Sequence, residues 1–295
     1  MISCSICESK EFEITYNGPI RIGLGQKRTE KSYDVYKCKD CDTILHENDA
    51  YVPEEYYEST QYRVELEGTS EIQNFYDKHD KDCLNKFRYT GTDIFRNKVV
   101  ADIGCGGGGW LDFLKGVALK TVAIEPSEYY RKHLKEKRHI TFPYMRDAFD
   151  EFSDKIDVIT SFDVIEHVSD PQEFSNDIFH LIRKGGQVIV GTPSEYRHLR
   201  ELVGNDFDSF IFSIQHPWVF AVKGLSILFE KAGFKDIKIK QYTNYGLGNV
   251  FAWLKERTPK GNITYPCISE TINEAWKANL AERGYGDYLV VYATK

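Results

Sequence analysis

The chain has 295 residues, 41% of them apolar, and its formal net charge is −7. This length allows one large domain with a small appendage, and the apolar fraction allows a sizeable core without disulfides. The negative balance argues against a duplex-binding surface, because neutralising phosphates requires a cationic face. The basic stretch 131–139 is interpreted as a solvated helix face. No run is long and apolar enough to span a bilayer, and the N-terminus has no signal-peptide core, so we expect a cytoplasmic protein.

Four of the seven cysteines form two short pairs, Cys4-x-x-Cys7 and Cys38-x-x-Cys41. Two such pairs can supply four thiolates in a tetrahedron, which is the geometry that structural zinc prefers. The alternatives are free or disulfide-bonded thiols and an iron–sulfur or redox site, but two pairs in a hairpin-rich segment favour zinc over a redox site. Four protein ligands leave no open position on the metal, so we expect no catalysis there. Residues 1–46, with short polar strands and turns, are therefore predicted to be a zinc-binding module.

Residues 47–98 are rich in tyrosine and glutamate and mostly helical in pattern, and we interpret them as a connector. From residue 99 the pattern alternates between strands and helices. Strands are predicted at 98–103, 119–124, 140–142, 156–162, 187–191, 235–242 and 288–293. Helices are predicted at 110–114, 127–137 (capped by Ser127), 171–182 (ended by Lys184-Gly185-Gly186) and 225–232, with one more in the insertion 243–285.

Strands that alternate with helices imply a parallel sheet covered on both faces. The predicted fold class is therefore α/β, with a doubly wound, mostly parallel, seven-stranded sheet in residues 99–295 and a small zinc-ribbon-like module before it.

The first strand of this series runs into the glycine loop Gly104-x-Gly106-x-x-Gly109. With Glu125 about twenty residues further on, the loop also satisfies the dinucleotide fingerprint. Asp102 discriminates between the cofactors, because a carboxylate at the mouth of the loop would repel a pyrophosphate. S-adenosylmethionine instead brings an ammonium group, which an acid suits, and glycines let the backbone approach its methionyl chain. Glu125 can accept hydrogen bonds from both ribose hydroxyls.

Two further motifs follow in order. The segment Phe162-Asp163-Val164-Ile165-Glu166-His167 comes after the fourth strand, and a Gly-Gly pair at 185–186 precedes the fifth. Together with the glycine loop and the acid at 125, this series resembles the class I S-adenosylmethionine-dependent methyltransferases over roughly residues 99–242. The resemblance implies a Rossmann-like sheet, S-adenosylmethionine as the cofactor and methyl transfer as the reaction.

The resemblance also implies the cofactor-binding residues. Methionyl contacts are expected at Asp102, Gly104 and Gly106, a ribose ligand at Glu125, adenine neighbours at Asp147 and Ala148, and further methionyl neighbours at Phe162, Asp163 and His167. Cys105 and Pro126, which adjoin these positions, complete the expected set.

A cysteine module followed by such a core resembles the sugar methyltransferases of antibiotic and surface-polysaccharide pathways, which act on nucleotide-linked sugars. The segment 53–63 is similar to that family's tyrosine-rich linker. Its Tyr57 and Tyr62 are interpreted either as substrate contacts or as residues of the hydrophobic core. The sugar C-methyltransferases carry a long additional C-terminal domain, whereas this chain stops after its core, which favours an oxygen acceptor. The alternatives are C-methylation of a keto-sugar, O-methylation of a phenol or quinone precursor, and a zinc ribbon that binds RNA or protein beside an idle core.

Methyl transfer from a sulfonium is an in-line displacement, so the enzyme mainly positions the reactants and excludes water. A sugar hydroxyl must also lose its proton, and histidine is the default base near neutral pH. His216 is the first candidate, because segment 213–220 follows the fifth strand and resembles the family's H-x-x-x-F motif. His167, after the fourth strand, is the second candidate, and Glu166 is expected to orient it or to bind a substrate hydroxyl.

Overall fold

The computed structural model describes residues 3–23, 25–47 and 51–295, so residues 1–2, 24 and 48–50 of the predicted module and connector lie outside it. The chain divides into two compact units. Unit 1 comprises Met1–Val52, Thr192–Ile227 and Ile239–Val290, and unit 2 comprises Pro53–Gly191, Leu228–Lys238 and Val291–Lys295. Unit 1 thus contains the predicted module together with later segments, whereas residues 53–98 of the predicted connector belong to unit 2.

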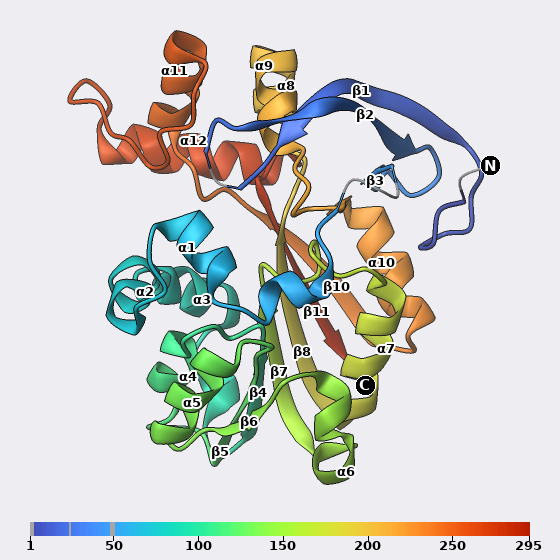
Figure 1. The fold of residues 1–295 in the computed structure, drawn as a ribbon, viewed down its shortest axis with the longest axis vertical. Helices are drawn as coiled ribbons and strands as arrows, with labels where there is room; N and C mark the ends of the chain where they lie inside the picture. Colours follow the sequence, from blue (N-terminus) through green and yellow to red (C-terminus); the bar gives the residue numbers. More distant parts are fainter. Residues whose placement is uncertain (1–2, 24, 48–50) are drawn as a thin grey trace. The chain divides into compact units, whose positions relative to one another are not determined.

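The larger sheet has seven strands in the order β10-β11-β8-β7-β4-β5-β6 (Figure 1). The strands are β4 Val99–Ile103, β5 Lys120–Ile124, β6 Ile140–Phe142, β7 Ile156–Phe162, β8 Ile182–Pro193, β10 Lys235–Tyr242 and β11 Tyr288–Thr294. The pairs β4–β5, β4–β7, β5–β6 and β7–β8 are all parallel. The predicted α/β class with a seven-stranded, mostly parallel sheet is confirmed.

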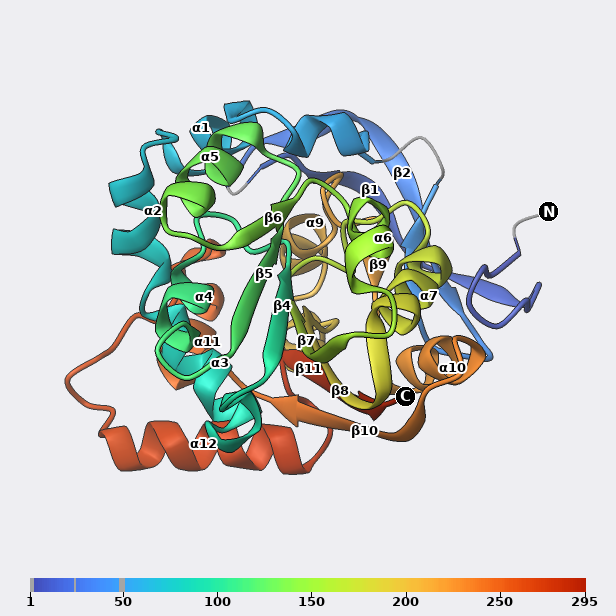
Figure 2. The same cartoon turned by 90° about the horizontal axis from the view of Figure 1, so that it is seen from below.

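Helices cover both faces of this sheet, as the continuous apolar strands predict. In Figure 2, α3 (Asp82–Thr90) and α4 (Gly109–Leu114) cover one face, and α6 (Phe149–Phe152) and α7 (Pro171–Leu181) cover the other. Val100 and Ala101 of β4 are fully buried between these layers. Asp170 starts α7, because its side chain accepts hydrogen bonds from the backbone N–H groups of Gln172 and Glu173.

Two local predictions in this unit were wrong. The helix from Pro171 ends at Leu181, and Ile182 already pairs with Ile156 of β7, so pairing with the sheet overrides the helical pattern. Ser127 precedes α5 (Glu128–Glu136), but its hydroxyl makes no capping hydrogen bond within the described chain.

The described part of the connector is mostly helical, as predicted. Its elements are η1 Glu54–Tyr57, α1 Gln61–Glu67, α2 Ile72–His79, α3 and η2 Asp93–Phe95. Phe75 of α2 is buried in one cluster with Leu111 of α4, Tyr130 and Leu134 of α5 and Cys105 of the glycine loop. The connector is therefore part of the core of unit 2.

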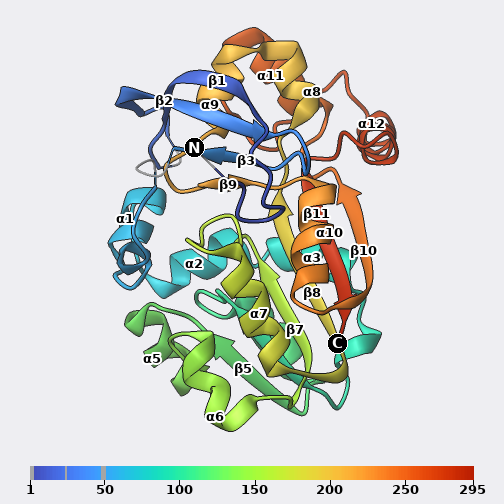
Figure 3. The same ribbon diagram turned by 90° about the vertical axis from the view of Figure 1, so that its right-hand side faces the viewer.

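Unit 1 contains an antiparallel sheet in the order β1-β2-β3-β9 (Figure 3). Its strands are β1 Phe12–Arg21, β2 Arg28–Cys38, β3 Ile44–His46 and β9 Trp218–Val219. β1 and β2 are much longer than the short strands predicted for residues 1–46. Helices α8 Arg197–Val203, α9 Asn205–Ile211, α11 Leu247–Glu256 and α12 Glu270–Glu282 complete the unit, and α10 Val222–Lys231 crosses its boundary.

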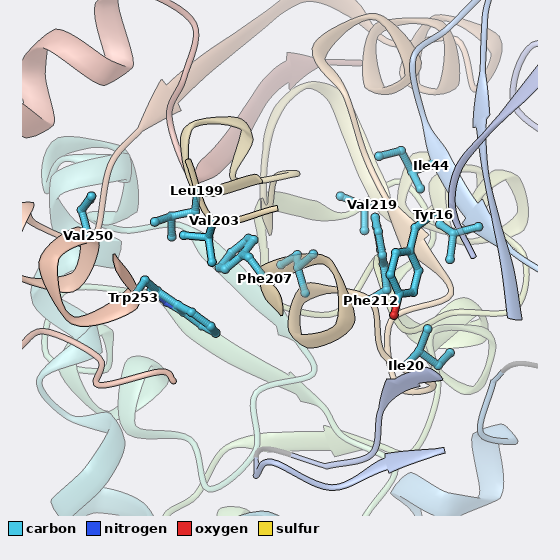
Figure 4. Close-up of a cluster of buried hydrophobic side chains, with 12 residues drawn as sticks. Tyr16, Ile20, Ile44, Leu199, Val203, Phe207, Phe212, Val219, Val250 and Trp253 are labelled. Carbon is cyan, nitrogen blue, oxygen red and sulfur yellow. The ribbon is translucent and has the colours of Figure 1, made fainter. Parts of the chain in front are cut away.

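One buried cluster holds unit 1 together (Figure 4). Phe207 of α9 lies between two groups of side chains, with Trp253 on one side and Phe212 and Tyr16 on the other. The rings of Phe207 and Trp253 meet edge to face with centroids 4.9 Å apart. Trp253 belongs to α11, which the sequence analysis missed when it predicted one helix in residues 243–285, because the glycines at its start resemble a loop. Among the helices of the described chain, none has both the length and the apolarity needed to cross a membrane.

Candidate active site

A cavity of about 610 Å³ lies in unit 2 at the carboxyl ends of β4, β5, β6 and β7. This end of the strands is where open α/β sheets bind ligands. The strand ends supply one part of the wall, including Gly104, Glu125 and Asp163. The connector supplies another part: Tyr57, Tyr62, Arg63, Phe75, His79, Asp82 and Lys86.

The glycine loop forms the floor of the cavity and tolerates no side chains at two positions. Gly104 and Gly106 have φ angles of +69° and +55°, which L-residues with a side chain rarely adopt. A Cβ on Gly104 would lie 2.3 Å from Val164, and one on Gly106 would lie 2.7 Å from the Phe75 ring. Glycine therefore allows both the backbone turn and the close approach of the connector.

Glu125 lies in the cavity wall with its carboxylate held in place by backbone groups. The N–H of Gly106 donates to Oε2 at 2.8 Å, and the N–H of Ser127 donates to Oε1 at 2.9 Å. Burial raises the pKa of Glu125, while these two bonds and the charges of Arg63 and Arg131 oppose the rise. Each carboxylate oxygen has a second lone pair, so both oxygens retain an acceptor site for a diol. These two acceptor sites suit the ribose hydroxyls of a nucleoside cofactor, which would donate to them.

Asp102 lies behind the loop and is not among the described residues that line the cavity. Its side chain is 1% exposed, and Oδ1 accepts a 2.6 Å hydrogen bond from the Thr160 hydroxyl. Burial raises the pKa of Asp102, and the charge of Lys86 and the bond from Thr160 oppose this rise. Lys86 itself lies in the cavity wall, with its ammonium 5.2 Å from the centroid of the Phe162 ring.

The other predicted cofactor residues fall into two groups. Gly104, Cys105, Gly106, Glu125, Pro126, Phe162, Asp163 and His167 all line the cavity. Asp147 and Ala148 are absent from the described wall, where Tyr144, Met145 and Arg146 stand instead. The Asp147 carboxylate accepts a 3.1 Å hydrogen bond from the Tyr144 N–H, and Ala148 is fully buried.

The predicted catalytic residues lie in both units. His167 lies in the cavity wall of unit 2, and the neighbouring Glu166 is 2% exposed and is not among the described lining residues. His216 belongs to unit 1, where its backbone N–H donates a 3.0 Å hydrogen bond to the backbone carbonyl of Ser213.

Arg63 of α1 is a cavity residue that the sequence analysis did not identify. Its Nε donates to the Tyr62 hydroxyl at 2.9 Å, and its Nη1 donates to Glu67. The guanidinium carbon lies 4.9 Å from the centroid of the Tyr62 ring and 5.2 Å from that of Phe75. Burial lowers the pKa of Arg63, but Tyr62, Tyr130 and Glu67 outweigh it and keep the group charged. The sequence feature that could have identified Arg63 as a site residue is its place at the end of the tyrosine-rich segment 53–63.

Tyr57 of the connector contacts the predicted catalytic residue His167. Its hydroxyl lies 3.0 Å from Nδ1 of His167, and the two rings meet edge to face with centroids 5.4 Å apart. Burial, with smaller contributions from Tyr56 and Glu166, raises the pKa of Tyr57 far above its usual value. The hydroxyl therefore keeps its proton at neutral pH. Tyr57 and Tyr62 both line the cavity, and Tyr62 is also buried.

The four paired cysteines lie together in unit 1. Sγ of Cys4 is 3.7 Å from that of Cys41, and Sγ of Cys7 is 3.4 Å from that of Cys38. All four sulfurs lie within 4.8 Å of one another. Tetrahedral zinc with bonds of about 2.3 Å would hold its sulfurs about 3.8 Å apart, whereas a disulfide needs about 2.05 Å. The four thiols therefore suit a tetrahedral zinc ion.

Comparisons with known proteins agree with this geometry. A family model described as "Methyltransferase domain" matches residues 76–239. The chain is 30% identical over 117 residues to the ubiquinone biosynthesis O-methyltransferase of Proteus mirabilis, a match covering 37% of this chain and 47% of that protein. For the Neisseria meningitidis protein of the same name, identity is 26% over 191 residues, covering 59% of this chain and 79% of that protein. The chain thus spans about half the length of the first of these relatives.

A crystal structure of a SAM-dependent methyltransferase from Archaeoglobus fulgidus is similar in fold. Its TM-score is 0.51 at 17% identity, and the match covers 75% of this chain and 98% of that one. An identity this low supports the fold alone.

Proposed function

This chain belongs to the methyltransferase-domain family, and we propose that it transfers a methyl group from S-adenosylmethionine to a hydroxyl oxygen of a small molecule. The observation that carries this proposal is the cavity at the carboxyl ends of the strands, with Glu125 anchored in its wall. A sugar, carried on a nucleotide, is our first candidate acceptor, in surface-polysaccharide or glycoconjugate biosynthesis.

The described residues suit the parts of the cofactor. Glu125 would accept from the ribose hydroxyls, and the backbone at Gly104 and Gly106 would approach the methionyl chain. Arg63, a cation between two aromatic rings in the cavity wall, would bind the methionyl carboxylate. We propose that the negative charge of Asp102, although its side chain accepts from Thr160 behind the wall, favours the ammonium group of S-adenosylmethionine over a pyrophosphate at this loop. When bound, the cofactor supplies an electrophilic methyl group on a sulfonium.

The protein contributes position, exclusion of water and a proton acceptor. Phe162, Phe75 and Tyr62 provide apolar wall that keeps water from the reacting groups. We propose His216 as the base that takes the proton of the acceptor hydroxyl, because histidine is the usual general base in proteins and the segment of His216 follows β8.

Two oxygen acceptors are supported by different observations. The cysteine module before the methyltransferase core favours a sugar. The name of the relatives from Proteus mirabilis and Neisseria meningitidis, ubiquinone biosynthesis O-methyltransferase, favours a phenol as the second candidate.

We also propose that Cys4, Cys7, Cys38 and Cys41 hold a structural zinc ion. With four thiolates on the metal no position is left for a substrate, so the zinc would stabilise the hairpins of unit 1 and take no part in methyl transfer.

The test is incubation of the protein with methyl-¹³C S-adenosylmethionine and two acceptor panels, nucleotide sugars and catechols. We expect a mass gain of one labelled methyl group in one panel and the carbon resonance of an O-methyl group in the product. The Glu125→Ala variant is the control for contaminating activity. A C-methyl resonance, or cofactor binding with no transfer to any hydroxyl, would overturn the proposal.

A further inference from the structure

Glu67, the last residue of α1, is a carboxylate buried inside the connector. Only 6% of its side chain is exposed. Burial raises the pKa of Glu67, but the hydrogen bond from His79 and the charge of Arg63 outweigh this effect and lower the pKa. The side chain is therefore an ionised group that is held away from solvent, and such a group is stable only where donors surround it.

The donors around this carboxylate come from both α1 and α2. Nη1 of Arg63, one helical turn before Glu67, donates to Oε1, and Nε2 of His79 lies 2.9 Å from the same oxygen. Nδ2 of Asn74 donates to Oε2 at 3.3 Å, and Nζ of Lys78 lies 3.8 Å from that oxygen. Several partners on each side hold the carboxylate in one place, so Glu67 is a fixed anchor for the groups that contact it.

These contacts decide the direction of the Arg63 guanidinium. Glu67 accepts from Nη1, and the Tyr62 hydroxyl accepts from Nε at 2.9 Å. The guanidinium is planar, so fixing Nε and Nη1 also fixes Nη2. Nη2 makes no hydrogen bond with the described residues, and a Cβ built on Gly106 would lie 3.5 Å from it. Nη2 therefore faces the glycine loop at the floor of the cavity.

The charge and the length of Arg63 have opposite consequences for an anion in the cavity. Glu67 neutralises part of the guanidinium charge, which by itself would weaken the attraction for an anion. Without Glu67, however, a largely buried guanidinium would lose its counter-charge and move toward solvent. A long side chain that the protein has not ordered beforehand also loses rotamer entropy when a ligand binds. The second and third effects outweigh the first, so the direction of Arg63 depends on Glu67.

We propose that Glu67 is a positioning residue, which holds Arg63 with Nη2 directed at the anionic end of the cofactor. The inference rests on the proposed role of Arg63 toward the methionyl carboxylate. Glu67 is not among the described residues that line the cavity, so it acts through Arg63. Loss of Glu67 should therefore weaken only those ligands that carry the carboxylate.

Calorimetry with S-adenosylhomocysteine and adenosine tests this dependence in Arg63→Met, Glu67→Ala and the double variant. Glu67→Ala should weaken S-adenosylhomocysteine about tenfold and leave adenosine unchanged, which also shows an intact pocket. The double variant should lose no more than Arg63→Met, because a positioning residue has no effect once the residue that it positions is absent. Glu67→Gln should lose only about threefold, because its amide oxygen still accepts from Nη1 but carries no charge.

Glu71→Gln is the matched control for the loss of one negative charge from the connector. Glu71 is exposed, and its side chain makes no hydrogen bond or ion pair with the described residues, so both affinities should equal those of the parent. Equal losses of the two ligands in Glu67→Ala, tighter binding of S-adenosylhomocysteine, or a further loss in the double variant would overturn the proposal. If Glu67→Ala does not fold, Glu67→Gln decides in the same two backgrounds, and an affinity equal to the parent's overturns the proposal.

The result also separates this inference from the proposed function. A tenfold loss in Arg63→Met without coupling to Glu67 would leave the proposed function intact and remove the inference alone. If the parent binds S-adenosylhomocysteine but methylates no hydroxyl, the proposed function fails, while the comparison of single and double variants still decides the inference.

Discussion

Asp112 of α4 is expected to make a large, pH-dependent contribution to stability. Nε2 of His139 donates to Oδ1 at 3.1 Å, while Nζ of Lys137 and the Tyr76 hydroxyl donate to Oδ2 at 3.1 and 3.2 Å. Burial raises the pKa of Asp112, but the hydrogen bonds from His139 and Lys137 and their charges outweigh it and lower the pKa to about 2. The charged carboxylate therefore joins α2, α4 and the residues that follow α5.

The magnitude follows from this shift. A change in pKa from 3.8 to about 2 corresponds to about 2 kcal/mol of free energy of unfolding, at about 1.4 kcal/mol per unit. The side chain is 26% exposed, so solvent screening reduces this figure only moderately. Because the pKa of the folded state is lowered, the stabilisation is complete well above pH 4 and disappears as the pH falls toward 2. Asp112→Asn should therefore lose about 2 kcal/mol at pH 7 and almost nothing near pH 2.

Urea denaturation of the parent and Asp112→Asn at several values between pH 7 and pH 2 measures this difference. Asp150→Asn is the matched control, because Asp150 is exposed and its side chain makes no hydrogen bond or ion pair with the described residues. Its free energy of unfolding should follow that of the parent at every pH. A loss below about 0.5 kcal/mol at pH 7, or a loss in Asp112→Asn that stays constant with pH, would refute the reasoning.

Four other predictions concern the two proposed sites. Glu125→Gln should weaken binding of S-adenosylhomocysteine about 10- to 100-fold in calorimetry, because a charged acceptor is lost; unchanged affinity would remove Glu125 as the ribose ligand. Arg63→Met should weaken S-adenosylhomocysteine about tenfold but leave adenosine unaffected, and equal losses for both would exclude a carboxylate contact. Cys38→Ser should abolish zinc content by elemental analysis while Cys267→Ser retains it, and a metal-free parent would contradict the zinc site. His216→Ala should lower kcat about 100-fold or more with cofactor affinity unchanged, and full activity would exclude it as the base.

The local features of this fold were predictable because they depend on neighbours in the chain. Apolar runs ended by glycines or acids located the strands of the larger sheet, and Glu125 could be placed at the end of β5. The spacing Cys-x-x-Cys confined each pair to a short turn, where the backbone N–H of Glu8 donates to the Cys4 carbonyl and that of Asp42 to the Cys38 carbonyl. Such patterns operate over a few residues, so the sequence alone contains them.

The composition of the cavity wall depended on contacts between segments far apart in the chain. The connector places Arg63 and Phe75 against the glycine loop, although about thirty to forty residues separate them. Asp102 has the residue type for a cofactor ligand, but its side chain accepts from Thr160 behind the wall.

The sequence by itself therefore determined the fold class, the glycine loop and the cysteine pairs, because residues close in the chain decide them. The tertiary structure alone decided which side chains face the cavity and which partner holds His167. The reason is that packing between distant elements sets the direction of a side chain, and no local pattern encodes that direction.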